Sequence, residues 1–133
     1  MSTTPVAKTH LILYVQDQAR SAEFYSRVFD CEPTLNVPGM TEFPLSESCV
    51  LGLMPEAGIK RLLGDRLPDP AHGSGIPRAE IYLLVENASF YHRRAIEAGA
   101  AELSPLADRD WGDCVAYSLD PDGHVLAFAE KSH

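Results

Sequence analysis

The apolar and polar positions of this chain change from a strand-like to a helix-like spacing near residue 17. Residues 9–15 (THLILYV) form an unbroken β-rich apolar run, which predicts a strand covered on both faces. His10 and Tyr14 share one of those faces, because side chains alternate along a strand. Asp17 stands where an N-cap belongs, and residues 18–30 carry large apolar side chains at helical spacing. The chain therefore opens with a strand and an amphipathic helix.

Prolines and glycines divide the next part of the chain into short pieces. They separate three extended segments near residues 34–37, 41–45 and 49–54. Residues 55–77 are rich in glycine and proline and are too long for a tight connection, so they predict a linker. A short helix at 58–63 fits within that linker.

The second half of the chain repeats the first. Residues 80–87 (EIYLLVEN) match residues 10–17 (HLILYVQD) position by position, with Glu80 at the place of His10. A second amphipathic helix follows, and Gly99 suits its C-terminal end. Three more strands are expected near 101–104, 114–119 and 124–130, and the last two should form a hairpin around the turn Asp-Pro-Asp-Gly at 120–123.

Both halves thus predict the order β-α-β-β-β, which places the chain in the α+β class. We expect one domain over residues 1–133, with a first module at about 8–54, the linker at 55–77, and a second module at about 78–131. Each module would bury one sheet face against its helix and leave the other face to enclose something.

Composition narrows the range of partners. The chain is 45% hydrophobic and 23% charged, and no apolar run reaches the roughly 18 residues that span a bilayer, so we expect no membrane partner. The net charge of −8 disfavours nucleic acid and anionic lipid. It weakly favours a cationic ligand, although a solvated acidic surface is the commoner cause of such a charge. The three cysteines lack the spacing of a zinc site and predict free thiols, and the absence of a signal-like N-terminus predicts a cytoplasmic protein.

The repeated unit, His10 and Glu80 at matching strand heads, and the turn at 120–123 together resemble the glyoxalase, bleomycin-resistance and extradiol-dioxygenase superfamily, also called vicinal oxygen chelate proteins. The resemblance covers nearly the whole chain. It implies paired modules that form a cup-shaped mixed sheet, a ligand on the concave face, and a homodimer.

Metal-dependent members of that family place ligands at four equivalent points, which here fall on His10, Gly52, Glu80 and Ala127. Glycine and alanine side chains cannot ligate, and Glu130 lies an odd number of residues from Ala127, on the opposite face of its strand. An open catalytic metal site normally keeps three protein ligands. With ligating side chains at only two of the four positions, we expect no cofactor. A divalent metal on His10 and Glu80 is the disfavoured alternative.

The two polar strand heads have several interpretations. His10 is a remnant of a metal site, a contact to a ligand, or a half-buried histidine bonded to the backbone. Glu80 is costly to bury unless it is paired, and His10 is its expected partner across the cup. Such a pair could also act as a general base in an enzyme.

The other candidate ligand-binding residues are aromatic or apolar. Tyr14 and Tyr82 should face the cup, with ordinary core packing as the alternative. Phe43, Met54 and Trp111 are candidates for the ligand wall, because small-molecule sites are lined by apolar and aromatic groups. The charged residues Arg109, Asp110 and Asp113 beside Trp111 are interpreted as solvated loop charges, and His92 as exposed.

The leading hypothesis is a metal-independent protein that binds or sequesters a small aromatic ligand, such as a cationic antibiotic, and so confers antibiotic resistance. The rival is a divalent-metal-dependent lyase, isomerase or dioxygenase acting on vicinal oxygens. A third hypothesis is that the chain shares only the fold of this family, because fold does not fix function. No phosphate-binding glycine loop, nucleophile elbow or His-Glu-x-x-His helix is present.

Overall fold

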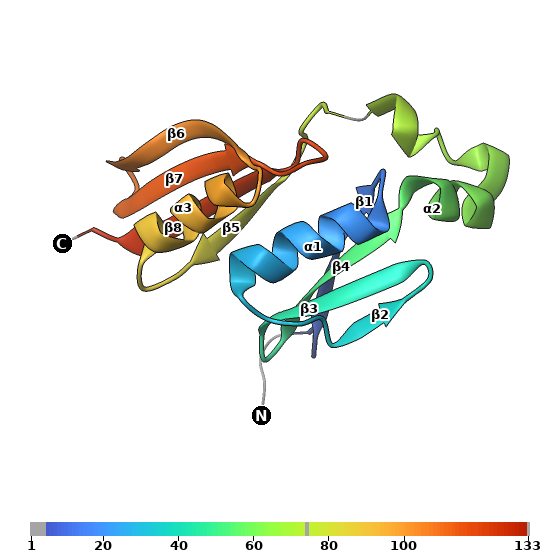
Figure 1. Ribbon diagram of the computed structural model, residues 1–133, viewed down its shortest axis with the longest axis horizontal. Coiled ribbons are helices and arrows are strands. Elements are labelled where there is room, and N and C mark those ends of the chain that lie inside the picture. Colours follow the sequence, from blue (N-terminus) through green and yellow to red (C-terminus); the bar gives the residue numbers. More distant parts are fainter. Residues whose placement is uncertain (1–4, 74, 133) are drawn as a thin grey trace. The chain divides into compact units, whose positions relative to one another are not determined.

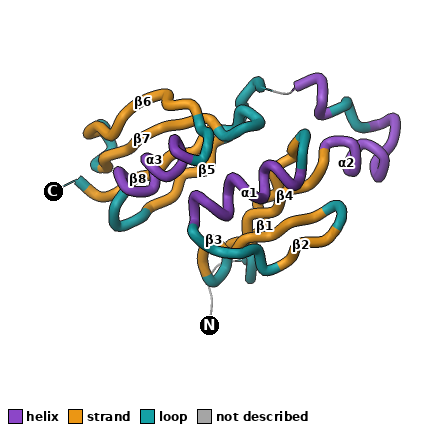
Figure 2. The backbone as a smooth tube through the Cα atoms, in the orientation of Figure 1, coloured by secondary structure: helices purple, strands orange, loops and turns teal. Residues whose placement is uncertain are grey.

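A computed structural model describes residues 5–73 and 75–132 of the chain. These residues form two compact units. The first unit comprises the described residues up to Ala22 together with Cys31–His72. The second comprises Glu23–Asp30 together with the described residues from Gly73 onward. Each unit contains one four-stranded sheet (Figures 1 and 2).

The sheet of the first unit has the strand order β1-β4-β3-β2, in which β1 pairs with β4 in parallel and the other neighbours are antiparallel. Its strands are β1 (Thr9–Val15), β2 (Leu35–Val37), β3 (Met40–Ser46) and β4 (Cys49–Pro55). Helix α1 (Gln18–Phe29) follows β1, and Asp17 caps it by accepting a hydrogen bond from the Arg20 amide at 3.1 Å.

The linker contains more regular structure than the sequence predicts. Helix α2 (Glu56–Leu63) continues directly from β4, and two short 3-10 turns follow at Gly64–Arg66 and Pro70–Gly73. The Lys60 ammonium donates to the Gly64 and Leu67 carbonyls at 3.0 and 2.5 Å, which closes the end of the helix. Helix α2 includes the short helix expected at 58–63, whereas the two 3-10 turns lie where glycines and prolines indicated a loop.

The second unit repeats the arrangement with strand order β5-β8-β7-β6. Strand β5 pairs with β8 in parallel, and β8, β7 and β6 pair in antiparallel fashion. Its elements are β5 (Glu80–Leu84), α3 (Ala88–Glu97), β6 (Ala101–Asp108), β7 (Asp113–Leu119) and β8 (Val125–Lys131).

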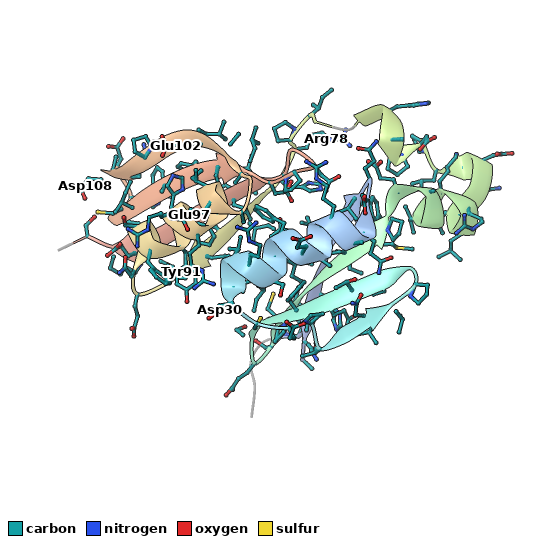
Figure 3. All side chains as sticks on the ribbon, viewed as in Figure 1. Asp30, Arg78, Tyr91, Glu97, Glu102 and Asp108 are labelled. Carbon is teal, nitrogen blue, oxygen red and sulfur yellow. The ribbon has the colours of Figure 1, made fainter. Side chains whose placement is uncertain are left out.

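Helix α3 covers one face of this second sheet. The Asn87 side chain caps the helix by accepting from the Phe90 amide at 3.1 Å, and the Glu130 carboxylate accepts from the Ala88 amide at 3.0 Å. The ring of Tyr91, labelled in Figure 3, stacks on Phe128 of β8 with centroids 5.8 Å apart. The opposite face of the sheet, which carries Ala127, is therefore the face turned away from α3.

The end of α1 is held to the β7–β8 turn by a buried polar contact. The Tyr25 hydroxyl donates to the Asp120 carboxylate at 2.6 Å, and Tyr25 is fully buried. Burial, followed by the negative charge of Asp120, raises the pKa of Tyr25 well above its ordinary value. Asp120 also accepts from the His124 amide at 2.8 Å, and Gly123 supplies the positive φ of 86° that the turn needs.

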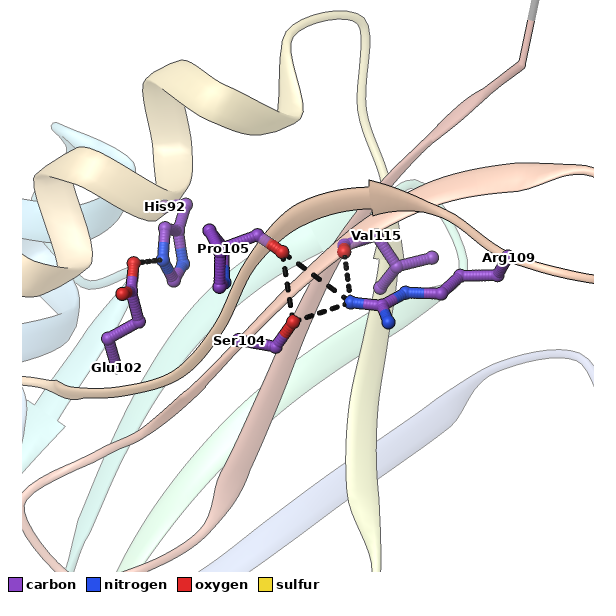
Figure 4. A network of polar contacts seen from close by, with 6 residues as sticks. All are labelled: His92, Glu102, Ser104, Pro105, Arg109 and Val115. Carbon is purple, nitrogen blue, oxygen red and sulfur yellow. Dashed lines mark hydrogen bonds and ion pairs between the residues drawn. The ribbon is translucent and has the colours of Figure 1, made fainter.

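The structure confirms the predicted α+β class and the repeated β-α-β-β-β order. Each repeat forms a separate four-stranded sheet. In the described part of the chain, no disulfide joins any of the three cysteines. His92 is not exposed as predicted. It is only 7% exposed, and its Nε2 lies 2.9 Å from the Glu102 carboxylate, because its side of α3 lies against β6 (Figure 4). No helix in the described residues is long and apolar enough to cross a membrane.

Candidate functional site

The sheet of the first unit has one buried and one partly exposed face. Leu13 and Thr41 are buried on one side, and Gln18 at the start of α1 donates to the Thr41 hydroxyl at 2.9 Å on that side. Ile12 and Tyr14 on the other side remain 41% and 37% exposed. Strand register defines this other side, called here the open face of unit 1, by residues in three rows: His10 with Val50 and Pro44, Ile12 with Gly52 and Glu42, and Tyr14 with Met54. Met40 shares this face, because it lies two residues before Glu42 on β3.

The polar group beside His10 comes from β3. The His10 Nδ1 atom lies 3.5 Å from the Glu42 Oε2 atom, and the two side chains are 39% and 23% exposed. Glu42 is the direct β3 neighbour of Gly52, so its carboxylate stands next to the point where a fourth-strand ligand is missing. The sequence did not indicate Glu42, because its place beside His10 depends on the β3–β4 register. The predicted partner, Glu80, belongs to the other unit.

The space above Gly52 is taken by apolar side chains. A Cβ atom added at Gly52 would lie 3.1 Å from Ile12 Cγ1 and 3.2 Å from Met40 Sδ. Contacts this short leave no room for a ligating side chain without displacing its neighbours. The position therefore supplies no donor and is closed by its surroundings.

The prediction that Phe43 lines a ligand wall on this face is not supported by its placement. Phe43 is fully buried and lies two residues from Thr41, on the side that contacts α1. The sequence around Phe43 did not indicate which face of β3 lies toward α1. Met54, in contrast, lies on the open face beside Tyr14.

The open face of unit 2 is the side of its sheet turned away from α3. Two of its aromatic residues are among the predicted site residues: Tyr82 is 36% exposed and Trp111, in the β6–β7 turn, is 57% exposed. Following the strand register from Tyr82 gives the remaining members: Glu80 and Leu84 of β5, Ala127 and Ala129 of β8, and Asp113, Val115 and Tyr117 of β7.

A hydrogen-bond network joins three of these positions. The Tyr82 hydroxyl donates to the Asp113 carboxylate at 2.5 Å and accepts from the Trp111 indole N–H at 2.8 Å. The Lys131 ammonium lies 3.3 Å from the other Asp113 oxygen. The Tyr82 hydroxyl therefore joins Trp111 to Asp113, and Asp113 is only 4% exposed.

These contacts perturb the titration of both partners in the directions expected for a protonated phenol bonded to a carboxylate. The hydrogen bond from Tyr82 is the main cause that lowers the pKa of Asp113, and Lys131 adds to it. Desolvation, followed by the bond to Asp113, raises the pKa of Tyr82, while the bond from Trp111 opposes the rise. The network is thus an ionised carboxylate held by neutral and cationic donors.

The space above Ala127 is also filled. Ala127, Val115 and Ala129 are fully buried and pack together, with Tyr117 against them. The bond from Tyr82 on β5 to Asp113 on β7 spans the intervening strand β8, so the Tyr82 side chain passes over its small alanines. At Ala127, as at Gly52, the position matching a metal ligand has no donor and is covered by the chain's own side chains.

The donor set does not fit the divalent metal that the resemblance associates with these positions. Of the four matching points, only His10 and Glu80 carry ligating side chains, and they lie in different units. Within residues 5–73 and 75–132, no group of three or more His, Cys, Asp or Glu side chains is arranged to hold an ion. An open metal site normally needs three such ligands.

Arg109 is a further member of the open face of unit 2. Its Nη2 donates to the Ser104 hydroxyl at 2.7 Å and to the Val115 carbonyl at 2.9 Å, with a long contact to the Pro105 carbonyl (Figure 4). The guanidinium carbon lies 5.2 Å from the centroid of the Tyr117 ring. The Arg109 side chain is therefore held along β6 and β7, beside the Tyr117 ring.

The prediction that Arg109 and Asp113 are solvated loop charges is wrong. Asp113 begins β7 and shares its face with Val115 and Tyr117, a two-residue period that was visible in the sequence. Arg109 is half-buried, because the tight β6–β7 turn directs its side chain back over the sheet. No sequence signal pointed to that direction.

Comparisons with known proteins agree with this architecture. A protein from Mycobacterium bovis, described as uncharacterized, is 28% identical over 127 residues, which cover 93% of this chain and 82% of that protein. A glyoxalase-related enzyme from Fulvimarina pelagi has a similar structure, with a TM-score of 0.78, 21% identity and coverage of 92% and 86% of the two chains.

A glyoxalase/bleomycin resistance protein/dioxygenase family enzyme from Burkholderia phytofirmans also has a TM-score of 0.78, at 18% identity, with coverage of 92% of this chain and 97% of that one. These identities support a shared fold. The sequence profile of the Glyoxalase/Bleomycin resistance protein/Dioxygenase superfamily matches residues 9–128. The chain belongs to that superfamily.

Proposed function

We propose that this protein binds a small planar aromatic molecule on its open faces, without a metal ion. The observation that carries the proposal is that both positions lacking a family ligand are filled. Ile12 and Met40 close over Gly52, and Ala127 is fully buried beneath aromatic neighbours. The side chains that occupy these places suit an aromatic ligand better than an ion.

The exposed aromatic groups support the same proposal. Tyr82 and Trp111 combine a ring surface with a polar group, and their mutual hydrogen bond holds the two side chains in one arrangement. Leu84 on the same face is 58% exposed. Apolar side chains left open in this way gain free energy when a ligand or a protein surface covers them.

A homodimer is part of the proposal, because Ile12 and Leu84 leave apolar surface uncovered on both open faces. A second copy of the chain would supply a matching surface by symmetry. Sedimentation equilibrium at micromolar concentration tests it. A monomer at all concentrations would contradict this part without affecting ligand binding to one chain.

Metal content and ligand-induced stabilisation test the proposal together. Elemental analysis of the purified protein should find less than stoichiometric metal, and Ni, Zn, Mn or Fe(II) should leave the Tm unchanged. An aromatic ligand at one hundred times its Kd should stabilise the fold by about 2.7 kcal/mol. Trp111 is the single tryptophan, so its fluorescence reports binding near the open face of unit 2.

Four variants separate the outcomes. Tyr82→Ala should weaken aromatic binding, while His72→Ala, in the exposed linker, should not. One tightly held metal ion per chain, lost on His10→Ala or Glu80→Ala, would overturn the proposal and favour a metal-dependent lyase, isomerase or dioxygenase.

A further inference from the structure

Arg109 has no acidic partner among the described residues, although the chain has 19 acidic and 11 basic residues. Its hydrogen bonds reach only a hydroxyl and two backbone carbonyls, and its remaining contact is the Tyr117 ring. Lys131 and Arg94 of the same unit, in contrast, each lie near an aspartate. Neutral acceptors satisfy donors but do not compensate the positive charge.

The guanidinium is also partly removed from water. Its Nε atom is buried and has no hydrogen-bond partner among the described residues. Nη2 is occupied by Ser104 and Val115, whereas Nη1 has no partner in the described part of the chain and is not among its buried atoms. A half-desolvated arginine with an accessible N–H group interacts strongly with an incoming anion, because less water screens the charge.

The surroundings place this charge beside an aromatic surface. Tyr82, Ala127 and Tyr117 are direct neighbours on three adjacent strands, and Arg109 lies over Tyr117. Adjacent strands are about 4.8 Å apart, so the Cα atoms of Tyr82 and Tyr117 are separated by about 10 Å. A small planar molecule that lies against Tyr82 would reach Arg109 with a substituent at its edge.

We propose that Arg109 is an anion-binding residue and that the ligand of this face is an aromatic carboxylate, held through Nη1 of Arg109 with its ring near Tyr82 and Trp111. The inference rests on the proposed binding function and specifies the chemical class of its ligand. It replaces the weak preference for a cation that the net charge of −8 indicated. Salt screens distant surface charges within about 8 Å, so the nearby guanidinium decides the preference.

The test uses three probes of similar ring size: trans-cinnamate, its neutral analogue trans-cinnamamide, and the cation benzyltrimethylammonium. Calorimetric titration gives the Kd of each probe. We expect cinnamate to bind the full chain at least tenfold more tightly than the other two, because a charged hydrogen bond is stronger than a neutral one. The Arg109 Nε–H and Trp111 indole N–H resonances should both move on addition of cinnamate.

Two variants assign the preference to Arg109. Arg109→Gln should remove the tenfold preference for cinnamate and leave the Kd of cinnamamide within twofold, and Arg109→Lys should retain part of the preference. Arg93→Gln is the matched control, because it removes the same charge from an exposed arginine that also lies near a ring, 6.0 Å from Phe90 on α3. That control should bind like the wild type.

The outcomes distinguish this inference from the proposed function. Binding of cinnamamide or the cation as tight as that of cinnamate overturns the anion site but leaves aromatic binding intact. A preference for cinnamate that survives in Arg109→Gln also overturns it. If Arg109→Gln does not fold, the wild-type protein provides the test. An Arg109 Nε–H chemical shift that does not change at saturating cinnamate would overturn the anion site. Failure of all three probes to bind overturns both proposals.

Discussion

Restoring the missing carboxylate at residue 127 should destabilise the protein without creating a metal site. Ala127 is fully buried among Val115, Ala129 and Tyr117. A glutamate side chain there must displace packed neighbours, which costs about 1–3 kcal/mol, and must bury a carboxylate, which costs several kcal/mol more. We therefore expect Ala127→Glu to lower the free energy of unfolding by about 3–6 kcal/mol.

That loss converts to a large change in Tm. With about 2.1 cal/mol/K of unfolding entropy per residue, 133 residues give about 280 cal/mol/K for cooperative unfolding. The Tm should therefore fall by about 10–20 °C. The control Ala107→Glu, at an exposed position of β6, should change the free energy of unfolding by less than about 0.5 kcal/mol.

Differential scanning calorimetry with and without Zn, Ni or Mn measures both effects. Stabilisation by metal would require the new carboxylate to meet other ligands, and the packing around Gly52 and Ala127 argues against that. A variant that keeps the wild-type Tm, or one that regains it when metal is added, would refute the reasoning that these positions are filled by the chain itself.

Three further predictions concern the polar contacts and one turn. Tyr25→Phe removes the buried bond to Asp120 and should cost about 1.5–3 kcal/mol in urea unfolding. Because burial raises the pKa of Tyr25 above its ordinary 10.0, this difference should shrink as pH rises beyond about 10, where the unfolded phenol ionises first; a constant difference would contradict the assignment. Tyr82→Phe should shift the Trp111 indole N–H resonance, which Tyr91→Phe should not. The same change should reduce the loss of stability below about pH 4, since the bond lowers the pKa of Asp113 and the unfolded carboxyl is protonated first as pH falls. Gly123→Ala should cost more than Gly112→Ala, because both have positive φ but only the Gly123 Cβ would meet backbone, 2.9 Å from the Gly75 Cα; equal thermal shifts would oppose this.

The order of strands and helices followed from local patterns that the structure reproduces closely. The first strand has the predicted bounds, and α1, α3 and the 120–123 turn lie where caps, apolar spacing and glycine placed them. Strand β6 extends to Asp108, four residues beyond the prediction. Pro105 lies within the strand, and the register shifts around it show how the strand accommodates the proline.

The sequence by itself determined the repeat and the α+β class, because both depend on residue identity and spacing along the chain. The family resemblance added that Gly52 and Ala127 stand without donors at two ligand positions. Only the tertiary structure decided what replaces those donors. Glu42 meets His10, and Tyr82 bonds Asp113 across β8, through strand register between distant segments. The Arg109 guanidinium lies over the Tyr117 ring, a contact that also depends on strand register. Such contacts depend on which strands pair and in what alignment, which local periodicity does not specify.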